Sequence, residues 1–175
     1  GYSGITRQGI RAEEPFFEAK GIAPAAGYAS TVDDLAKFAM WQFRLRGDRE
    51  EVLHGYTLAE MQRTHFVDPD NNTQRGLGFS VSRRDDKTWV GHGGSCPGFQ
   101  TTFTMQNEEK IAAIAFLNAR ENPGKYANGI YELVLDAVLS AAKGDPISLT
   151  TDNGDESGMS HEIVDYEDYI GRYVR

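Results

Sequence analysis

Four short runs with the pattern of β-strands follow one another closely over residues 76–119. They read GLGFSVSR, TWVGHGG, FQTTFTMQ and KIAAIAFLNA, and the polar or turn-forming segments RRDDK, SCPG and NEE separate them. Short turns of this kind join antiparallel neighbours, whereas parallel neighbours need a long crossover. The sequence therefore predicts a mostly antiparallel sheet.

Two segments before these strands have the pattern of helices. The segment STVDDLAKFAMWQFRLRG, residues 30–47, places apolar residues at helical spacing and ends on a glycine. Ser30 and Asp33 resemble a capping box at its start, and Thr57 and Glu60 form the same pattern in TLAEMQRTH. We expect a helix at each place, with the polar cluster DPDNNTQRG as a turn after the second.

A third helix is expected after the strands, over residues 126–144. YANGIYELVLDAVLSAAKG has one apolar stripe and is long enough to cover a sheet. IAAIAFL, the core of the fourth strand run, is apolar throughout, which suits a strand buried on both faces. These patterns predict an α+β fold, a mostly antiparallel sheet flanked by helices.

The composition divides the chain into three parts and limits its partners. Residues 1–143 are expected to form one unit, opening with an ordered loop, followed by an acidic linker at 144–161 and a tyrosine-rich tail at 162–175. The net charge of −8 argues against binding to nucleic acid or an anionic membrane, because both need a basic surface. No apolar run approaches the roughly 20 residues of a spanning helix.

The segment WVGHGGSCPGFQTTF, residues 89–103, holds the chemically suggestive residues, and three interpretations compete. A metal site is disfavoured because the four histidines (His54, His65, His92 and His161) lack the short spacings of metal loops. A nucleophile at Ser95 falls short of the G-x-S-x-G pattern, since Pro97 replaces the second glycine. The simplest interpretation is a strand end and a tight turn in which glycines allow close packing.

The order of motifs adds a resemblance. AAGYASTVDDLAKFAMW, then LGFSVS, then WVGHGGSCPGFQTTFTMQNEEKIAAIAFLNA resembles the serine β-lactamase and penicillin-binding-protein-like hydrolases. The class C-like branch, with D-aminopeptidases, D-alanyl carboxypeptidases and esterases, is the most similar. The match is collinear from Ala25 to Asn118, and we expect it to extend to Lys143 as the C-terminal half of a catalytic domain. The tail YEDYIGRYVR resembles the opening of the small β-barrel domain that often follows the catalytic domain in this family, so residues 162–175 are expected to be the start of an incomplete C-terminal β-domain.

The resemblance implies roles for four consecutive residues. His92, Gly93 and Gly94 match the third active-site motif, with His in the position of Lys and Gly where Ser or Thr often stands. His92 would then act on the substrate carboxylate or on a proton, Gly93 and Gly94 would let the substrate lie against the strand, and the backbone N–H of Ser95 would donate to an oxyanion. The resemblance implies a small-molecule or peptide substrate, no metal or organic cofactor, and an extracytoplasmic or periplasmic location.

One departure from the family pattern concerns the nucleophile. No Ser-x-x-Lys and Tyr-x-Asn pair precedes His92, and the look-alikes Tyr126-Ala-Asn128 and Ser140-Ala-Ala-Lys143 follow it in reversed order. We therefore expect a fragment that is inactive alone and associates through exposed core surface. Two alternatives remain: a non-catalytic binding or assembly module with the same fold, and a cysteine enzyme using Cys96.

Overall fold

The computed structural model describes residues 1–69, 73–84 and 86–143, so the expected linker at 144–161 and tail at 162–175 lie outside the described residues. Its elements in chain order are the 3₁₀ turn η1 (Lys20–Ile22), α1 (Ala23–Ala26), α2 (Val32–Arg44), α3 (Gly55–Met61), β1 (Phe66–Asp68), β2 (Thr73–Arg75), β3 (Ser80–Arg84), β4 (Lys87–Cys96), β5 (Phe99–Gln106), β6 (Ile111–Leu117) and α4 (Pro123–Lys143). This is the α+β class that the sequence predicts. The expected loop before residue 30 contains two helical turns, η1 and α1.

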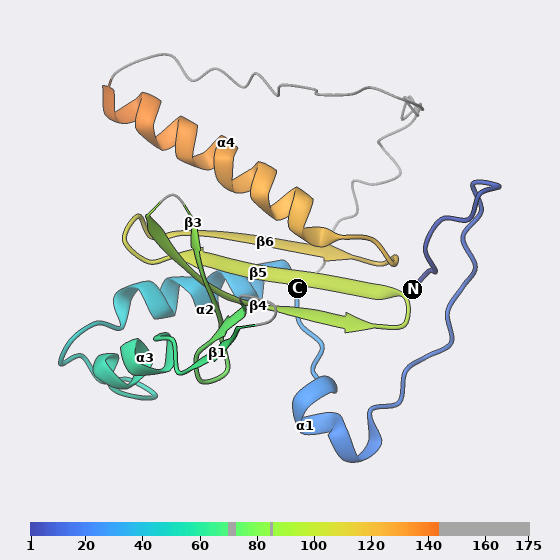
Figure 1. Ribbon diagram of the computed structural model, residues 1–175, viewed down its shortest axis with the longest axis horizontal. Coiled ribbons are helices and arrows are strands. Elements are labelled where there is room, and N and C mark those ends of the chain that lie inside the picture. The colour runs from blue at the N-terminus through green and yellow to red at the C-terminus, as the bar shows by residue number, and fades with distance from the viewer. Residues whose placement is uncertain (70–72, 85, 144–175) are drawn as a thin grey trace, which may run out of the picture.

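The strands form a single sheet in the order β1-β2-β3-β4-β5-β6, and every neighbouring pair is antiparallel (Figure 1). All four strand runs predicted from the sequence are present as β3 to β6. The longest pairing joins β4 to β5, from Trp89 opposite Gln106 to Cys96 opposite Phe99. The sheet is therefore a simple meander, with the glycine-rich segment in its middle.

The prediction of a plain turn at DPDNNTQRG is wrong in part, because Thr73–Arg75 forms β2. This strand pairs with β1 on one side and with β3 on the other, where Gln74 lies opposite Val81. Backbone hydrogen bonding to two neighbours thus holds three polar residues in a strand, although they have no hydrophobic pattern. Exposure of Phe66 and Val67 on β1 shows how little of this hairpin is buried.

Helix α2 is where the sequence predicts it, but its cap is one residue further along. The hydroxyl of Thr31, not Ser30, accepts a hydrogen bond from the Asp34 N–H at 3.1 Å. Helix α3 also differs, since it begins at Gly55 after His54 and has no side-chain cap. Thr57 therefore lies inside the helix, and the predicted capping box at Thr57 and Glu60 is wrong.

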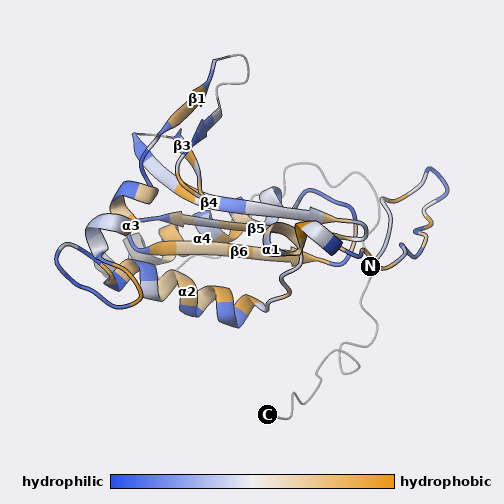
Figure 2. Ribbon diagram, turned by 90° about the horizontal axis from the view of Figure 1, so that it is seen from below, coloured by the Kyte–Doolittle hydropathy of each residue, from blue (hydrophilic) through white to orange (hydrophobic). Residues whose placement is uncertain are grey.

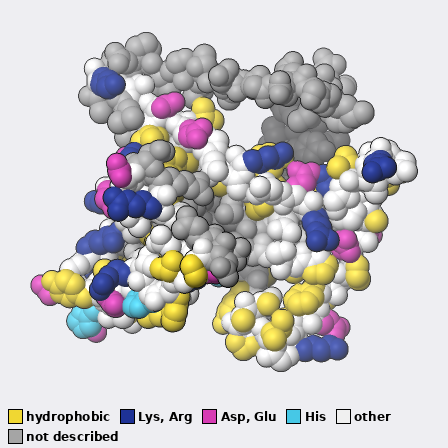
Figure 3. Space-filling view, in the orientation of Figure 1, with side chains coloured by type: hydrophobic (Ala, Val, Ile, Leu, Met, Phe, Trp, Pro, Cys, Tyr) yellow, Lys and Arg dark blue, Asp and Glu magenta, His cyan; other side chains and the backbone are white. Residues whose placement is uncertain are grey.

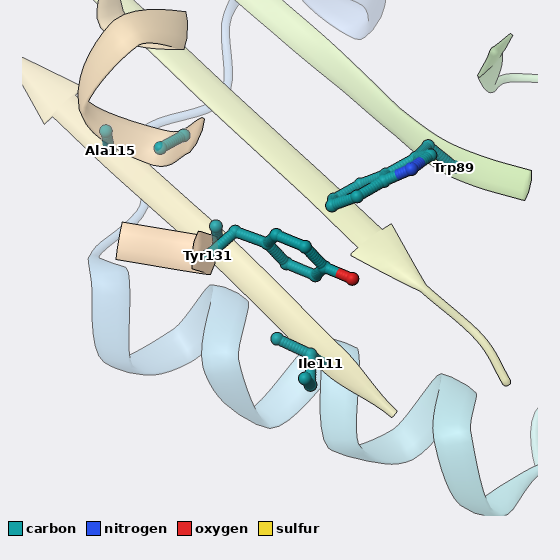
Figure 4. Packing of buried hydrophobic residues seen from close by; sticks show 6 residues of the cluster. Trp89, Ile111, Ala115 and Tyr131 are labelled. Carbon is teal, nitrogen blue, oxygen red and sulfur yellow. The ribbon is translucent and has the colours of Figure 1, made fainter. Parts of the chain in front are cut away.

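Helices cover the sheet on both faces, with α4 on one side and α2 on the other (Figure 1). Under α4, six buried residues form one cluster, four of which Figure 4 labels: Trp89, Ile111, Ala113, Ala115, Ala127 and Tyr131. Under α2, Phe103 and Met105 pack against Ala39, with Ala112 and Ile114 beside them. Figure 2 shows β6 as a largely hydrophobic strand. Its residues on the α4 face (Ile111, Ala113 and Ala115) are buried, whereas those on the α2 face are only half-buried, so the prediction of a strand buried on both faces holds for the α4 face alone.

A polar contact fixes α4 over the sheet. The ring of Tyr131 meets Trp89 edge-on at 4.0 Å between centroids, and its hydroxyl donates to Glu109 Oε2 at 2.7 Å. Lys87 forms an ion pair with the same carboxylate. Hydrogen bonds from Lys87 and Tyr131 lower the pKa of Glu109, while burial and the Glu109 hydrogen bond raise the pKa of Tyr131.

Candidate functional site

The glycine-rich part of β4 is an open strand edge. Strand β3 pairs with β4 only as far as Ser80 opposite Gly91. Beyond that point, residues 92–96 keep β5 on one side and have no strand on the other within the described residues. An open edge offers backbone N–H and C=O groups to an extended partner. His92, Gly93, Gly94 and Ser95, the four residues singled out from the sequence, all lie on it.

The turn at the end of β4 determines which backbone groups face this edge. Pro97 and Gly98 connect β4 to β5, and Gly98 has a φ of +76°, as the third position of a type II turn requires. Such a turn closes with a hydrogen bond between its first and last residues, here Cys96 and Phe99. Pairs alternate along an antiparallel ladder, so we expect Ser95 and Gly93 to direct their N–H groups away from β5, toward the open edge.

The N-terminal segment holds this turn against the end of β6. The N–H of Tyr2 donates to Asn118 O at 2.8 Å and to Gly98 O at 3.3 Å, and Arg120 N donates back to Tyr2 O at 3.0 Å. An ion pair between Arg11 and Glu121 also connects the N-terminal segment to the loop between β6 and α4. Chain segments far apart in sequence thus brace the end of the glycine-rich hairpin.

The imidazole of His92 is exposed and has a defined orientation. Its Nδ1 lies 2.6 Å from the carbonyl oxygen of Gly93. A carbonyl only accepts hydrogen bonds, so Nδ1 carries the proton of the neutral ring, and Nε2 presents a lone pair. A neutral His92 is therefore ready to accept a proton or a hydrogen bond at Nε2, and a protonated one donates there.

The side chains of the four residues divide between the two faces of the sheet. His92 lies opposite Phe103, which packs on α2, so the imidazole is on the α2 face. Ser95 is on the α4 face, where its hydroxyl accepts from Gln100 Nε2 at 2.9 Å. The structure does not bring the Ser95 hydroxyl beside the His92 ring, which removes the obvious base for a nucleophile at Ser95.

Cys96 is also too far from His92 for the imidazole to act as its base. Both residues belong to β4 and lie on the same face, four residues apart. At about 3.3 Å per residue, their Cα atoms are separated by roughly 13 Å. The two side chains therefore do not meet.

The two look-alike motifs on α4 do not form a site. Tyr126 is near the start of the helix, where its hydroxyl donates to Glu121 Oε2 at 3.1 Å. Ser140 is in the last turn of the same helix, beside Lys143. Fourteen residues at about 1.5 Å each place Ser140 and Tyr126 roughly 21 Å apart. The helix C-terminus is also the negative end of its dipole, which opposes a developing alkoxide.

A cavity of about 240 Å³ lies on the α4 face, between β3, β4, β5 and the first turns of α4. Hydroxyl-bearing side chains contribute to its wall, among them Ser80, Ser82, Thr102 and Thr104. Gly91, His92 and Gly93 of β4 also line this cavity, which therefore borders the glycine-rich strand.

The described residues contain no group of three or more His, Cys, Asp or Glu side chains placed to hold a metal ion. His54 pairs with Glu50 and His65 with Glu60, each on its own part of the surface, and His161 lies outside the described residues. Within the part of the chain that the structure describes, no helix is both long and apolar enough to cross a membrane.

Hydrophobic side chains are exposed around α1, where Figure 3 shows them gathered at the lower part of the molecule. Phe16 is 90% exposed, Tyr28 86% and Ile22 57%. Exposed apolar surface of this kind is typical of an interaction site. The sequence-based expectation of association through such surface stays a prediction.

Comparison with protein families gives one match, in which the model of the beta-lactamase family matches residues 3–145. The match includes the whole sheet and α4. No curated protein is similar enough in sequence to count as a match.

Solved structures similar to the chain include a penicillin-binding protein homologue and an amidohydrolase. The octameric penicillin-binding protein homologue from Pyrococcus abyssi superposes with a TM-score of 0.58 at 21% identity, over 80% of this chain and 30% of that one. A D-stereospecific amidohydrolase from Streptomyces sp. gives a TM-score of 0.46 at 21% identity, over 67% of this chain and 34% of that one. The first shows the fold, and the chain spans about a third of the length of each.

Proposed function

Because the chain belongs to the beta-lactamase family, we propose that it forms one wall of the active site of a serine hydrolase. The reaction is acyl transfer: a serine hydroxyl attacks an amide or ester carbonyl, the amine or alcohol leaves, and water hydrolyses the acyl-enzyme. The substrate is a β-lactam, a D-amino-acid peptide or a small ester. The open edge of β4 at residues 92–96 is the single observation that carries the proposal.

Gly93 and Gly94 have no side chain to block this edge, so an extended substrate backbone lies directly against it. The outward N–H of Ser95 then serves as an oxyanion donor. It stabilises the negative charge that develops on the carbonyl oxygen, and losing one such donor costs about 3 kcal/mol of transition-state stabilisation. The donor is a backbone group, so its position is fixed by the pairing of β4 with β5 and does not depend on a side-chain rotamer.

His92 moves a proton or binds the substrate carboxylate. With Nδ1 held on the Gly93 carbonyl, only Nε2 can face the substrate. In the neutral ring Nε2 takes up a proton, and in the charged ring it donates to a carboxylate or to a leaving group. The same atom serves both roles.

We infer that the nucleophile comes from a Ser-x-x-Lys segment outside these 175 residues and that this chain alone has no turnover. No such motif precedes His92, the look-alike at Ser140 is at the wrong end of α4, and the chain spans 30% of the penicillin-binding protein homologue. Residues 1–143 are then part of the catalytic domain.

The test is intact-mass spectrometry of the product of the whole coding sequence, and separately of the 175-residue chain, after incubation with a fluorophosphonate or benzylpenicillin. The proposal expects one adduct on the whole product, mapped by peptide analysis to a serine of a Ser-x-x-Lys motif, and none on the chain. An adduct on Ser95 or Ser140 contradicts it. Absence of any adduct supports the binding or assembly module instead.

A further inference from the structure

The cavity under α4 has a floor without side chains. Gly91 and Gly93 of β4 line it, and neither residue projects a side chain into the space. Ser80 on β3 and Thr104 on β5 both pair with Gly91, one on each side, so their side chains flank this floor. Neighbouring strands are about 4.8 Å apart, which separates the Cα atoms of Ser80 and Thr104 by roughly 10 Å. The sheet therefore leaves an open space between these two side chains.

Hydroxyl groups border this space on both sides. Ser82 follows Ser80 on β3 and Thr102 precedes Thr104 on β5, each by two residues and hence on the same face. All four side chains are half-buried. Among the described residues, the hydroxyls of Ser82, Thr102 and Thr104 have no hydrogen-bond partner. Three hydroxyl groups are thus free to bond a molecule in the cavity.

The remaining walls of the cavity are apolar. Trp89 lies two residues before Gly91 on β4, and its indole is directed toward Tyr131 of α4 (Figure 4). Ala127, from the first turns of α4, covers the cavity and is 1% exposed. Pockets for small ligands combine apolar walls with a few polar groups that fix orientation. This cavity offers both kinds of surface.

The lining also limits the charge and the size of an occupant. Among the described residues that line the cavity, only His92 has a titratable side chain, and its imidazole is on the α2 face. A charged group in the cavity would lose hydration without gaining an opposite charge, so a neutral ligand is favoured. The volume of about 240 Å³ equals that of about eight water molecules in the liquid. A molecule with one saturated ring fits this volume.

We propose that this cavity binds a neutral polyhydroxylated molecule of the size of one pyranose ring, such as a monosaccharide. Its hydroxyls exchange hydrogen bonds with Ser82, Thr102 and Thr104, because a hydroxyl both donates and accepts. Its C–H groups lie against the apolar wall at Trp89. The site is separate from the open edge at residues 92–96, no reaction takes place in it, and the proposal does not rest on the hydrolase function.

The test is an NMR titration of the product of the whole coding sequence with D-glucose. D-glucuronate and D-glucosamine are the matched probes, since they have the same ring and carry a negative and a positive charge. The indole N–H of Trp89 reports binding, and its signal is identified by its loss in Trp89→Phe. We expect glucose to shift this signal with a Kd that is roughly millimolar, as the ligand efficiency of small molecules allows. The two charged probes should bind at least about tenfold more weakly.

Three variants locate the sugar on the sheet. Thr102→Val and Thr104→Val each remove one hydroxyl at nearly constant volume. We expect each to raise the Kd for glucose about fivefold, the loss that one neutral hydrogen bond brings. Thr101→Val is the matched control, because it changes the same strand on the α2 face and should leave the Kd unchanged. Thermal unfolding of all three variants checks that the fold is retained.

Two results on binding overturn the inference: no saturable binding of glucose by the wild-type protein, and charged probes that bind as tightly as glucose. An equal Kd in all three threonine variants also overturns it, since the sugar then binds elsewhere. Displacement of glucose when benzylpenicillin acylates the protein overturns the assignment of the cavity as a separate site. A protein that binds glucose as expected but is never acylated supports the inference and contradicts the proposed hydrolase function alone.

Discussion

Gly91 should be the glycine of β4 on which stability depends most. A Cβ atom at this position would lie 2.1 Å from Phe103 O and 2.9 Å from Thr104 Cα, both backbone atoms of β5. Neither can rotate away, so Gly91→Ala must push the two central strands apart. Overpacking of this kind costs about 2–3 kcal/mol in the free energy of unfolding. For a chain of this size that lowers Tm by roughly 5–10 °C.

Gly93→Ala is the matched control, two residues along the same strand and on the same face. Its nearest contact would be Thr101 O at 3.5 Å, an ordinary van der Waals distance. We expect stability to stay within about 1 kcal/mol of wild type, with a slight gain because alanine restricts the unfolded chain. Urea and thermal unfolding, followed by the fluorescence of Trp41 and Trp89, compare the variants. Equal stability of Gly91→Ala and Gly93→Ala would refute the reasoning from strand separation.

Two further predictions concern the ends of the structure. Thr31→Ala should lower the free energy of unfolding by about 1 kcal/mol, because Thr31 caps α2. Ser30→Ala should leave the free energy of unfolding unchanged. A larger loss of stability in Ser30→Ala than in Thr31→Ala would instead indicate that Ser30 is the cap, as the sequence suggests. Glu109 has a lowered pKa in the folded chain, so its carboxylate stabilises the fold above the ordinary value of 4.5, and this contribution is lost as pH falls through the lowered pKa. Denaturant unfolding between pH 3 and 7 should therefore show that the free energies of unfolding of wild type and Glu109→Gln approach each other as the pH falls. A difference in free energy that does not change with pH would contradict the role of Lys87 and Tyr131.

Hydrophobic pattern and turn chemistry were enough to predict the middle of the fold. The strand over residues 99–106 has the predicted bounds, because turn-forming residues precede and follow it. The turn before it is shorter than the predicted separator SCPG, since Ser95 and Cys96 belong to β4 and only Pro97 and Gly98 connect the strands. The helix over 30–47 was equally clear from its periodicity, as α2 shows. In both cases the pattern that predicts the element lies within the element itself or in the turns beside it.

Strand β2 and the cap of α2 were not predicted from the sequence. Strand β2 is polar and is held by pairing on both sides. The cap of α2 is Thr31 rather than Ser30 because the chain enters the helix one residue later than the capping pattern suggests.

In the candidate site, the motif predicted His92 to Ser95, but not that the ring of His92 and the hydroxyl of Ser95 would face opposite sides.

The most direct test of the account is a crystal structure of the whole gene product acylated by benzylpenicillin. The account predicts that the carbonyl oxygen of the acyl group lies about 3 Å from the backbone nitrogen of Ser95, the distance of an oxyanion-hole donor. The acyl chain should run along residues 92–96, with its carboxylate on the His92 face. An adduct bound away from this edge, such as in the cavity under α4, would contradict the central claim that β4 is a wall of the active site.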